Sequence, residues 1–191
     1  MTYNAFIQMN GKDVVINGVP SKMLISKLGR STNEQVVQYR RQGRCLLADE
    51  VKCGDLIEEG DTIYLVLASR KEEGAIYAIL GICNAEVGIQ YFTEKHDEYG
   101  NPEFDEYGNP VAEWVSRGST WGHQMFVSAR MRVEDPGILH TTICTFHIPA
   151  TQECYELDRA VVNGAKTYQV DTIDDISAPG LKILQVSTDE R

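Results

Sequence analysis

Three side chains that could act in catalysis or metal binding lie within the short segment HTTICTFH. They are His140, Cys144 and His147, and the residues around them favour a β-strand. Because residues an odd number of positions apart face opposite sides of a strand, His140 and His147 should not share a site. The other two histidines, His96 and His123, stand alone in the sequence. We therefore expect no catalytic residues, no cofactor and no enzymatic activity.

A second candidate is the acidic stretch DEYGNPEFDEYGNP, in which one hexapeptide occurs twice between Asp97 and Pro110. A calcium loop would need oxygen ligands at alternate positions, a central glycine and a closing glutamate. Here the acidic residues form adjacent pairs, and each copy ends in a proline. Glycine, asparagine and proline all favour bends. The stretch therefore predicts two consecutive bends and no metal site.

The repeat lies inside a polar segment of about residues 88–122 that also carries several aromatic residues. Connections of this length are usually functional or disordered, and aromatic residues in a polar loop favour contact with another subunit. We expect this segment to form an arm that reaches a neighbouring subunit. The candidate interface residues are Tyr99, Asn101, Phe104, Tyr107, Asn109, Trp114 and Trp121.

Length and charge narrow the class of protein. The chain has 191 residues, which we interpret as a single domain over residues 1–191. With 18 basic against 28 acidic side chains, it offers little to neutralise phosphates, so specific nucleic-acid binding is disfavoured. No apolar run is long enough for a membrane helix, and the first twenty residues lack the pattern of a signal peptide. We expect an intracellular protein that makes no membrane contact.

Short β-strands separated by turns dominate the sequence pattern. The expected strands are Asn4–Met9, Asp13–Asn17, Lys22–Ser26, Asp61–Ala68, Ala75–Cys83, Gln124–Val133, Leu139–Ile148, Ala160–Asn163, Lys166–Thr172 and Leu181–Ser187. The pattern predicts an all-β fold: a small antiparallel β-barrel, SH3-like or sandwich-like, with one long inserted arm and at most one short helix. That helix is expected at Ser31–Gly43, where capping residues flank a thin apolar face, with a loop as the alternative.

Turn signals and a weak internal repeat support hairpins. Asn163-Gly164 lies between two β-rich runs, which is a strong signal for a type I′ hairpin turn. The segments Asp55–Val66 and Asp158–Val170 both begin with aspartate and share the same spacing of glycine, tyrosine and valine. We interpret the repeat as two similar hairpins within one barrel.

Two blocks that cover about half of the chain resemble a known family. GDLIEEGDTIYLV with AILGICN, and DRAVVNGAKTYQVDTID with PGLKILQV, resemble the β-barrel head–tail connector proteins of tailed bacteriophages, also called neck, head-closure or stopper proteins. The resemblance implies a non-enzymatic virion protein that forms a homo-oligomeric ring, with the portal or adaptor protein above and a tail protein below. It further implies that DNA passes through the ring without specific binding. The alternatives are a phage tail or baseplate protein, and a small β-barrel ligand-binding module or enzyme that uses the strand with Cys144.

The cysteines predict a protein without disulfide bonds. The chain has five, an odd number, and no Cys-x-x-Cys pair occurs among them. Intracellular thiols stay reduced. Thiol labelling under denaturing, non-reducing conditions should therefore add five labels to the intact mass. Three or fewer labels would contradict the prediction, because each disulfide removes two.

Overall fold

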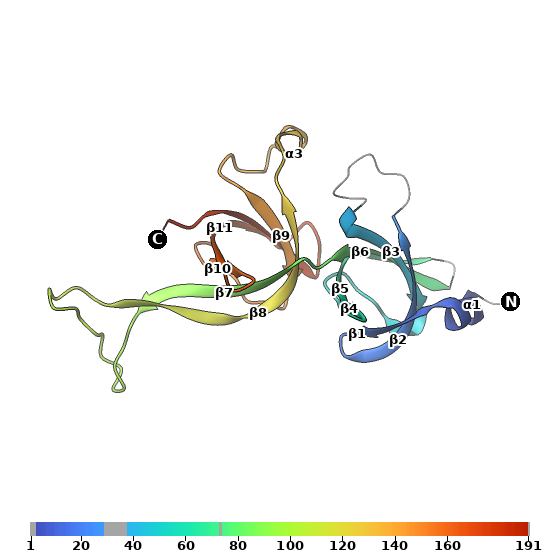
Figure 1. The fold of residues 1–191 in the computed structure, drawn as a ribbon, viewed down its shortest axis with the longest axis horizontal. Helices are drawn as coiled ribbons and strands as arrows, with labels where there is room; N and C mark the ends of the chain where they lie inside the picture. The colour runs from blue at the N-terminus through green and yellow to red at the C-terminus, as the bar shows by residue number, and fades with distance from the viewer. Residues whose placement is uncertain (1–2, 29–37, 73, 191) are drawn as a thin grey trace.

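Twelve strands close into two antiparallel barrels of six strands each, joined by a short linker at Cys83 and Asn84 (Figure 1). The structure, a computed structural model, describes residues 3–28, 38–72 and 74–190. The first barrel contains β1 (Lys12–Ile16), β2 (Val19–Lys27), β3 (Arg40–Leu46), β4 (Leu56–Glu59), β5 (Thr62–Glu72) and β6 (Ala75–Ile82). The second contains β7 (Ala85–Glu94), β8 (Ala112–Phe126), β9 (Cys144–Pro149), β10 (Arg159–Val162), β11 (Lys166–Asp174) and β12 (Leu181–Thr188).

The predicted all-β class and small antiparallel barrel are confirmed, but the strands form two barrels where the sequence predicted one. Each sheet closes through a pair between its first and fourth strands. In the first barrel this pair joins Val15 to Glu58, and in the second it joins Val87 to Val162. Alternating apolar residues identify a strand but not its partner, so the sequence pattern could not show that closure occurs twice.

The two barrels have the same strand order, which extends the internal repeat to all six strands. The order β1-β2-β3-β6-β5-β4 in the first barrel matches β7-β8-β9-β12-β11-β10 in the second. The repeated hairpins, β4–β5 and β10–β11, carry matching hydrogen bonds. Val66 N donates to Asp55 O, and Val170 N donates to Asp158 O, both at 2.9 Å. Both second strands also contain an irregularity just after that valine.

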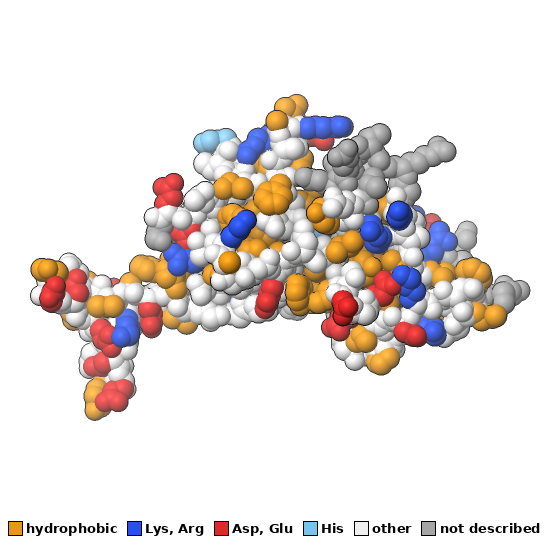
Figure 2. Space-filling view, viewed as in Figure 1, with side chains coloured by type: hydrophobic (Ala, Val, Ile, Leu, Met, Phe, Trp, Pro, Cys, Tyr) orange, Lys and Arg blue, Asp and Glu red, His pale blue; other side chains and the backbone are white. Residues whose placement is uncertain are grey.

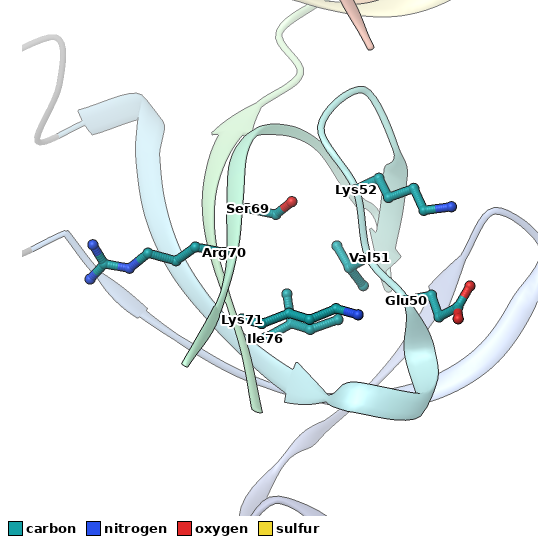
Figure 3. A pocket seen from close by; sticks show the side chains of 7 residues that line it. All are labelled: Glu50, Val51, Lys52, Ser69, Arg70, Lys71 and Ile76. Atoms are coloured by element: carbon teal, nitrogen blue, oxygen red, sulfur yellow. The ribbon is translucent and has the colours of Figure 1, made fainter. Parts of the chain in front are cut away.

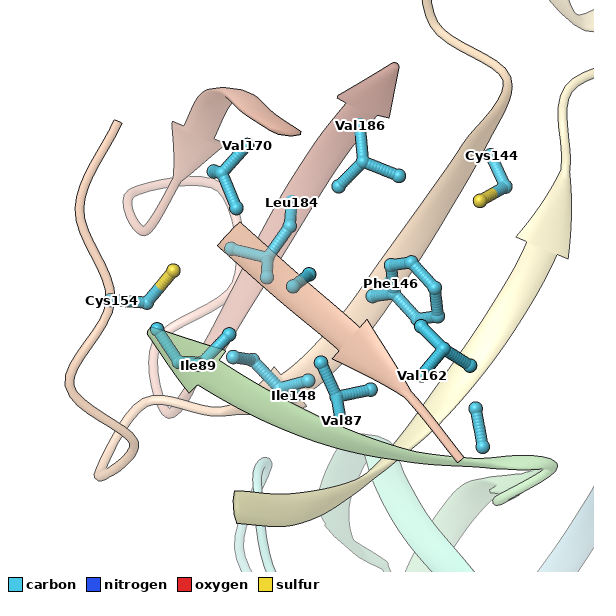
Figure 4. Close-up of a cluster of buried hydrophobic side chains, with 12 residues drawn as sticks. Val87, Ile89, Cys144, Phe146, Ile148, Cys154, Val162, Val170, Leu184 and Val186 are labelled. Atoms are coloured by element: carbon cyan, nitrogen blue, oxygen red, sulfur yellow. The ribbon is translucent and has the colours of Figure 1, made fainter. Parts of the chain in front are cut away.

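Each barrel has its own apolar core, which the inward-facing residues of its strands fill. The first core is built around Met23, Ile57, Ile76 and Leu80. The second is built around Phe146 and includes two buried cysteines (Figure 4). Its members are Ala85, Val87, Ile89, Cys144, Phe146, Ile148, Cys154, Ala160, Val162, Val170, Leu184 and Val186. Each barrel therefore buries the apolar side chains of its core among its own strands and not against the other barrel.

Two short α-helices have both ends within the described residues, against the one helix that the sequence predicted, and a single 3-10 turn covers Leu47–Asp49. Helix α1 (Tyr3–Asn10) replaces the strand expected at Asn4–Met9, and it buries Ile7 against the first barrel. The strand expected at Gln124–Val133 ends earlier than predicted, because β8 ends at Phe126. Helix α3 (Ala129–Glu134) follows it. Neither helix, nor any other in the described residues, is long and apolar enough to cross a membrane.

The expected helix at Ser31–Gly43 falls mostly outside the described residues. Gln38 and Tyr39 are helical, but from Arg40 onward the chain belongs to β3, so the predicted helix is wrong there. Strand β9 begins only at Cys144, five residues later than expected from Leu139. Both errors have one cause: the strands pair across the sheet, and that pairing fixes their ends more strongly than local sequence does.

The turn at Asn163-Gly164 has the predicted type I′ backbone and also closes the second barrel. Both residues have positive φ angles, 50° and 66°. Asn163 additionally exchanges two hydrogen bonds with Glu86 on β7: its backbone N–H donates to Glu86 O, and its Oδ1 accepts from Glu86 N, both at 2.9 Å. A Cβ added at Gly164 would meet no atom within 4 Å. Substitution there therefore tests backbone conformation alone.

We expect Gly164→Val to lower the free energy of unfolding by about 1–3 kcal/mol, the cost of a strained backbone position. Asn163→Gly keeps the positive φ but loses the Oδ1 contact to Glu86, and should cost about 1 kcal/mol. Asn163→Val should cost more than Asn163→Gly because it loses both. Urea denaturation measures all three. Equal stability of Gly164→Val and the native chain would contradict the assigned turn.

Candidate functional site: the branched arm

The β7–β8 hairpin continues beyond the second barrel as a two-stranded arm (Figure 1). Strand β7 pairs with β10 only as far as Gln90, so from Tyr91 onward it pairs with β8 alone. The stem of the arm therefore consists of Tyr91–Glu94 paired with residues 112–115. This range is narrower than the expected 88–122, because residues 88–90 also pair with β10 inside the barrel.

Three backbone hydrogen bonds form a closed cycle at the end of the stem. Lys95 N donates to Val111 O, Val111 N donates to Glu103 O, and Glu103 N donates to Lys95 O, each at 2.8 Å. These residues are spaced eight apart, which is the period of the sequence repeat. Each copy of the repeat thus leaves the cycle and returns to it. The two resulting loops are the first lobe (residues 96–102) and the second lobe (residues 104–110), which together we call the tip.

An aspartate holds each lobe in the same way. Asp97 Oδ1 accepts hydrogen bonds from the backbone N–H groups of Tyr99 and Asn101, both at 2.9 Å, and Asn101 Nδ2 donates to Asp97 Oδ2 at 3.2 Å. Asp105 repeats these contacts in the second lobe. Hydrogen bonds from Asn101 lower the pKa of Asp97. Because N–H donors occupy both carboxylate oxygens, these groups act as turn supports and are poorly placed as calcium ligands.

The tip presents aromatic rings and carboxylates to solvent. Tyr99 and Tyr107 are 80% and 81% exposed, and Phe104 between the lobes is 59% exposed. Glu98 and Glu106 precede the two tyrosines and are also exposed. From residue 94 to residue 113 the arm carries seven acidic side chains and one lysine. Large exposed rings on a short, internally bonded loop are typical of a contact surface.

The structure divides the seven predicted interface residues into different roles. Tyr99, Phe104 and Tyr107 face solvent at the tip, whereas Asn101 and Asn109 bond within their own lobes. The two tryptophans do not belong to the tip.

Trp114 packs at the base of the stem, where its ring lies 5.0 Å from Phe92 and 3.7 Å from the Arg159 guanidinium. Arg159 in turn pairs with Asp189 near the C-terminus. Trp121 lies opposite Glu86 in the β7–β8 strand pair, on the wall of the second barrel, and its side chain is 40% exposed. Phe92 is one of the aromatic residues of the predicted arm segment but was not among the predicted interface residues, and it is 60% exposed on the stem. Phe92 lies directly opposite Trp114 in the β7–β8 pair, and the signal available in the sequence was an aromatic residue within a polar segment.

A second polar site lies between the barrels and involves residues that the sequence left apart. Strand pairing places His123 on β8 opposite His147 on β9, with ring centroids 5.8 Å apart, so His123 does not stand alone as predicted. His123 donates from Nδ1 to Ile82 O of the first barrel at 2.9 Å. His147 Nδ1 and Arg40 Nε have no hydrogen-bond partner among the described residues. His140 lies exposed in the loop before β9, away from this pair.

The chemistry of this inter-barrel site is unfavourable for catalysis. Burial, together with the neighbouring His123 and Arg40, lowers the pKa of His147 to about 4. Burial also raises the pKa of the Cys144 thiol, whose Sγ accepts a hydrogen bond from Gln124 Nε2 at 3.4 Å. A protonated, buried thiol is a poor nucleophile. Cys144 faces the second core, and His147 lies on the opposite face of β9 beside His123.

No protein-family model matches the chain, and no curated protein matches it. Among solved structures, protein SF1141 from Shigella flexneri 2a is similar with a TM-score of 0.43 and 15% sequence identity. The similarity covers 57% of this chain and 96% of SF1141. Similarity at this level does not establish a shared fold or function.

The buried histidines predict a loss of stability in mild acid. The pKa of His147 is lower in the folded chain than its ordinary value of 6.5. Below pH 6.5 the unfolded chain therefore binds a proton that the folded chain does not, and the free energy of unfolding falls until the pH reaches about 4. The difference corresponds to about 3 kcal/mol. We expect His147→Gln to reduce the drop in melting temperature between these pH values. His140→Gln is the matched control, and an equal effect of both substitutions would contradict the assignment.

Proposed function

We propose that this chain is a non-enzymatic structural protein of the phage head–tail junction, of the head-closure or stopper type, and that copies associate into a ring through the arm. The observation that carries the proposal is the tip, which holds three exposed aromatic rings away from both barrels. The resemblance of two sequence blocks to head–tail connector proteins supplies the biological setting. In that setting the protein resides in the virion and is assembled in the host cytoplasm.

The arm suits contact with a neighbouring subunit for an energetic reason. A mobile loop would lose conformational entropy on binding, whereas the tip is already ordered by its backbone cycle and its Asp97 and Asp105 turns. Exposed aromatic side chains bring large contact area at low entropic cost. Burial of Tyr99, Tyr107 and Phe104 on a neighbour would therefore stabilise the assembly.

The shape of the molecule favours a ring over a two-fold dimer. The arm lies at one end of the elongated chain, and the first barrel lies at the other (Figure 1). An arm that binds the next copy at a different surface gives a head-to-tail interface, which closes into a ring when the rotation permits. The two faces of such a ring would contact the portal or adaptor protein and a tail protein. The net charge of −10 disfavours retention of DNA in the channel.

Two alternatives remain distinct from this proposal. A tail or baseplate protein could assemble through the same arm, so particle morphology must separate that role from head closure. A ligand-binding module or enzyme would depend on the inter-barrel site instead. The neutral His147 and the buried Cys144 thiol make that second alternative weaker.

Replacement of His96–Pro110 by Asn-Gly should remove the tip and leave the fold intact. Lys95 N already bonds to Val111 O, so a two-residue type I′ turn can close the stem there. We expect an unchanged melting temperature and a loss of self-association in sedimentation velocity. In a complementation assay, this variant should yield tail-less particles whose heads leak DNA. Tail-less particles with full, sealed heads would instead favour the tail alternative.

A matched variant separates the aromatic rings from the tip as a whole. Tyr99→Ser, Phe104→Ser and Tyr107→Ser together keep the Asp97 and Asp105 turns. We expect this triple variant to weaken association by about tenfold or more, as for central aromatic anchors of interfaces. Full self-association of the variant without the tip would overturn the proposal.

A further inference from the structure

The charge of the chain is distributed unevenly along its length. Residues 1–84 carry ten acidic and ten basic side chains, whereas residues 85–191 carry 18 acidic and eight basic ones. The whole net charge therefore belongs to the second barrel and the arm. Figure 2 shows acidic side chains gathered on the arm, whereas basic and acidic side chains occur together on the visible face of the first barrel. The acidic arm of one copy would therefore meet a first barrel of zero formal net charge on another copy, where only local basic side chains can attract it.

The first barrel has a pocket with an apolar floor and a basic rim. It lies between residues 50–52 and the adjoining ends of β5 and β6, and its volume is about 330 Å³ (Figure 3). The buried side chains of Val51 and Ile76 form its floor. Lys52 and Lys71 form its rim, and Ser69 lies beside them. We call this site the mouth pocket.

The two lysines of the mouth pocket form no ion pair within the described part of the chain. Both side chains are exposed. The nearby Arg70 points away from the pocket in Figure 3, toward Tyr77, whose ring centroid lies 4.8 Å from the guanidinium. Glu50 is the acidic residue among the lining side chains. The pocket therefore offers two ammonium groups that form no ion pair with a described residue, beside the Glu50 carboxylate and above the almost fully buried Val51 and Ile76.

Each lobe of the tip matches this pattern in chemistry. A lobe presents a tyrosine ring next to a glutamate, Glu98-Tyr99 in the first and Glu106-Tyr107 in the second. A tyrosine ring can cover an apolar floor while its hydroxyl remains near polar groups. The adjacent carboxylate then lies within reach of a lysine on the rim. Neither Glu98 nor Glu106 takes part in the hydrogen bonds that hold its lobe, so both carboxylates are free for such contact.

We propose that the mouth pocket receives one lobe of the arm of a second copy of this chain. The tyrosine of that lobe covers Val51 and Ile76, and its glutamate pairs with Lys52 or Lys71. The inference rests on the proposed function, since it names the surface that the arm contacts during self-association. It also accounts for the doubled repeat, because either lobe can present the same pair of side chains.

A charge swap tests the contact directly. Lys52→Glu with Lys71→Glu places like charges opposite the lobe and should weaken self-association by about tenfold or more in sedimentation velocity. Glu98→Lys with Glu106→Lys should weaken it similarly, and these positions leave the Asp97 and Asp105 turns unchanged. The combination of all four substitutions should restore association to near the native level. The native interaction should also weaken as salt concentration rises.

The matched control is Lys27→Glu with Lys166→Glu, which makes the same change in net charge at exposed positions away from the mouth pocket. We expect association of this control to stay near the native level. An equal loss in the control, or no recovery in the fourfold variant, overturns the inference. If removal of the tip abolishes association but the Lys52/Lys71 variant associates normally, the arm docks elsewhere and only this inference fails. If removal of the tip has no effect, the proposed function fails with it.

Discussion

Closure of each sheet by a pair between its first and fourth strands is the constraint on which the rest of the molecule depends. The β1–β4 and β7–β10 pairs leave no free sheet edge in either barrel, so each core is sealed by its own strands. Once closed, a barrel tolerates a long extension of one hairpin, because the extension adds no strand to the wall. The arm is such an extension of β7 and β8, at the position that the short Asn17-Gly18 turn occupies in the first barrel.

The tip and the inter-barrel site treat polar groups in opposite ways. At the tip, exposed aspartates accept backbone hydrogen bonds and thereby free the rings beside them to face solvent. Between the barrels, His123 is buried and His147 is partly buried, and the pKa of each is lowered. Polar side-chain contacts in this region join His123 to Ile82, Arg40 to Met125, and the linker residue Asn84 to Gln124. The molecule therefore places internally hydrogen-bonded loops at the end of the arm and a pH-sensitive contact between its barrels.

Much of the fold follows from the sequence, and its failures have specific physical causes. The hairpin turn at Asn163 was predictable because positive φ restricts the residue type. The two-barrel arrangement was not, because strand partners depend on contacts distant in the chain. The tip was assigned to the correct residues, yet its backbone cycle could not be foreseen, since it joins Lys95, Glu103 and Val111 through main-chain atoms alone. His123 and His147 meet only because β8 pairs with β9.

The backbone cycle at the arm also bears on how this region can change over generations. Because the chain returns to the same hydrogen-bonding point after every eight residues, an in-frame duplication or loss of one unit leaves both stem strands in register. Replication slippage at a tandem repeat produces such changes readily. A change in the number of lobes would therefore leave the strand pairing of both barrels as it is, because the repeat lies wholly beyond the stem.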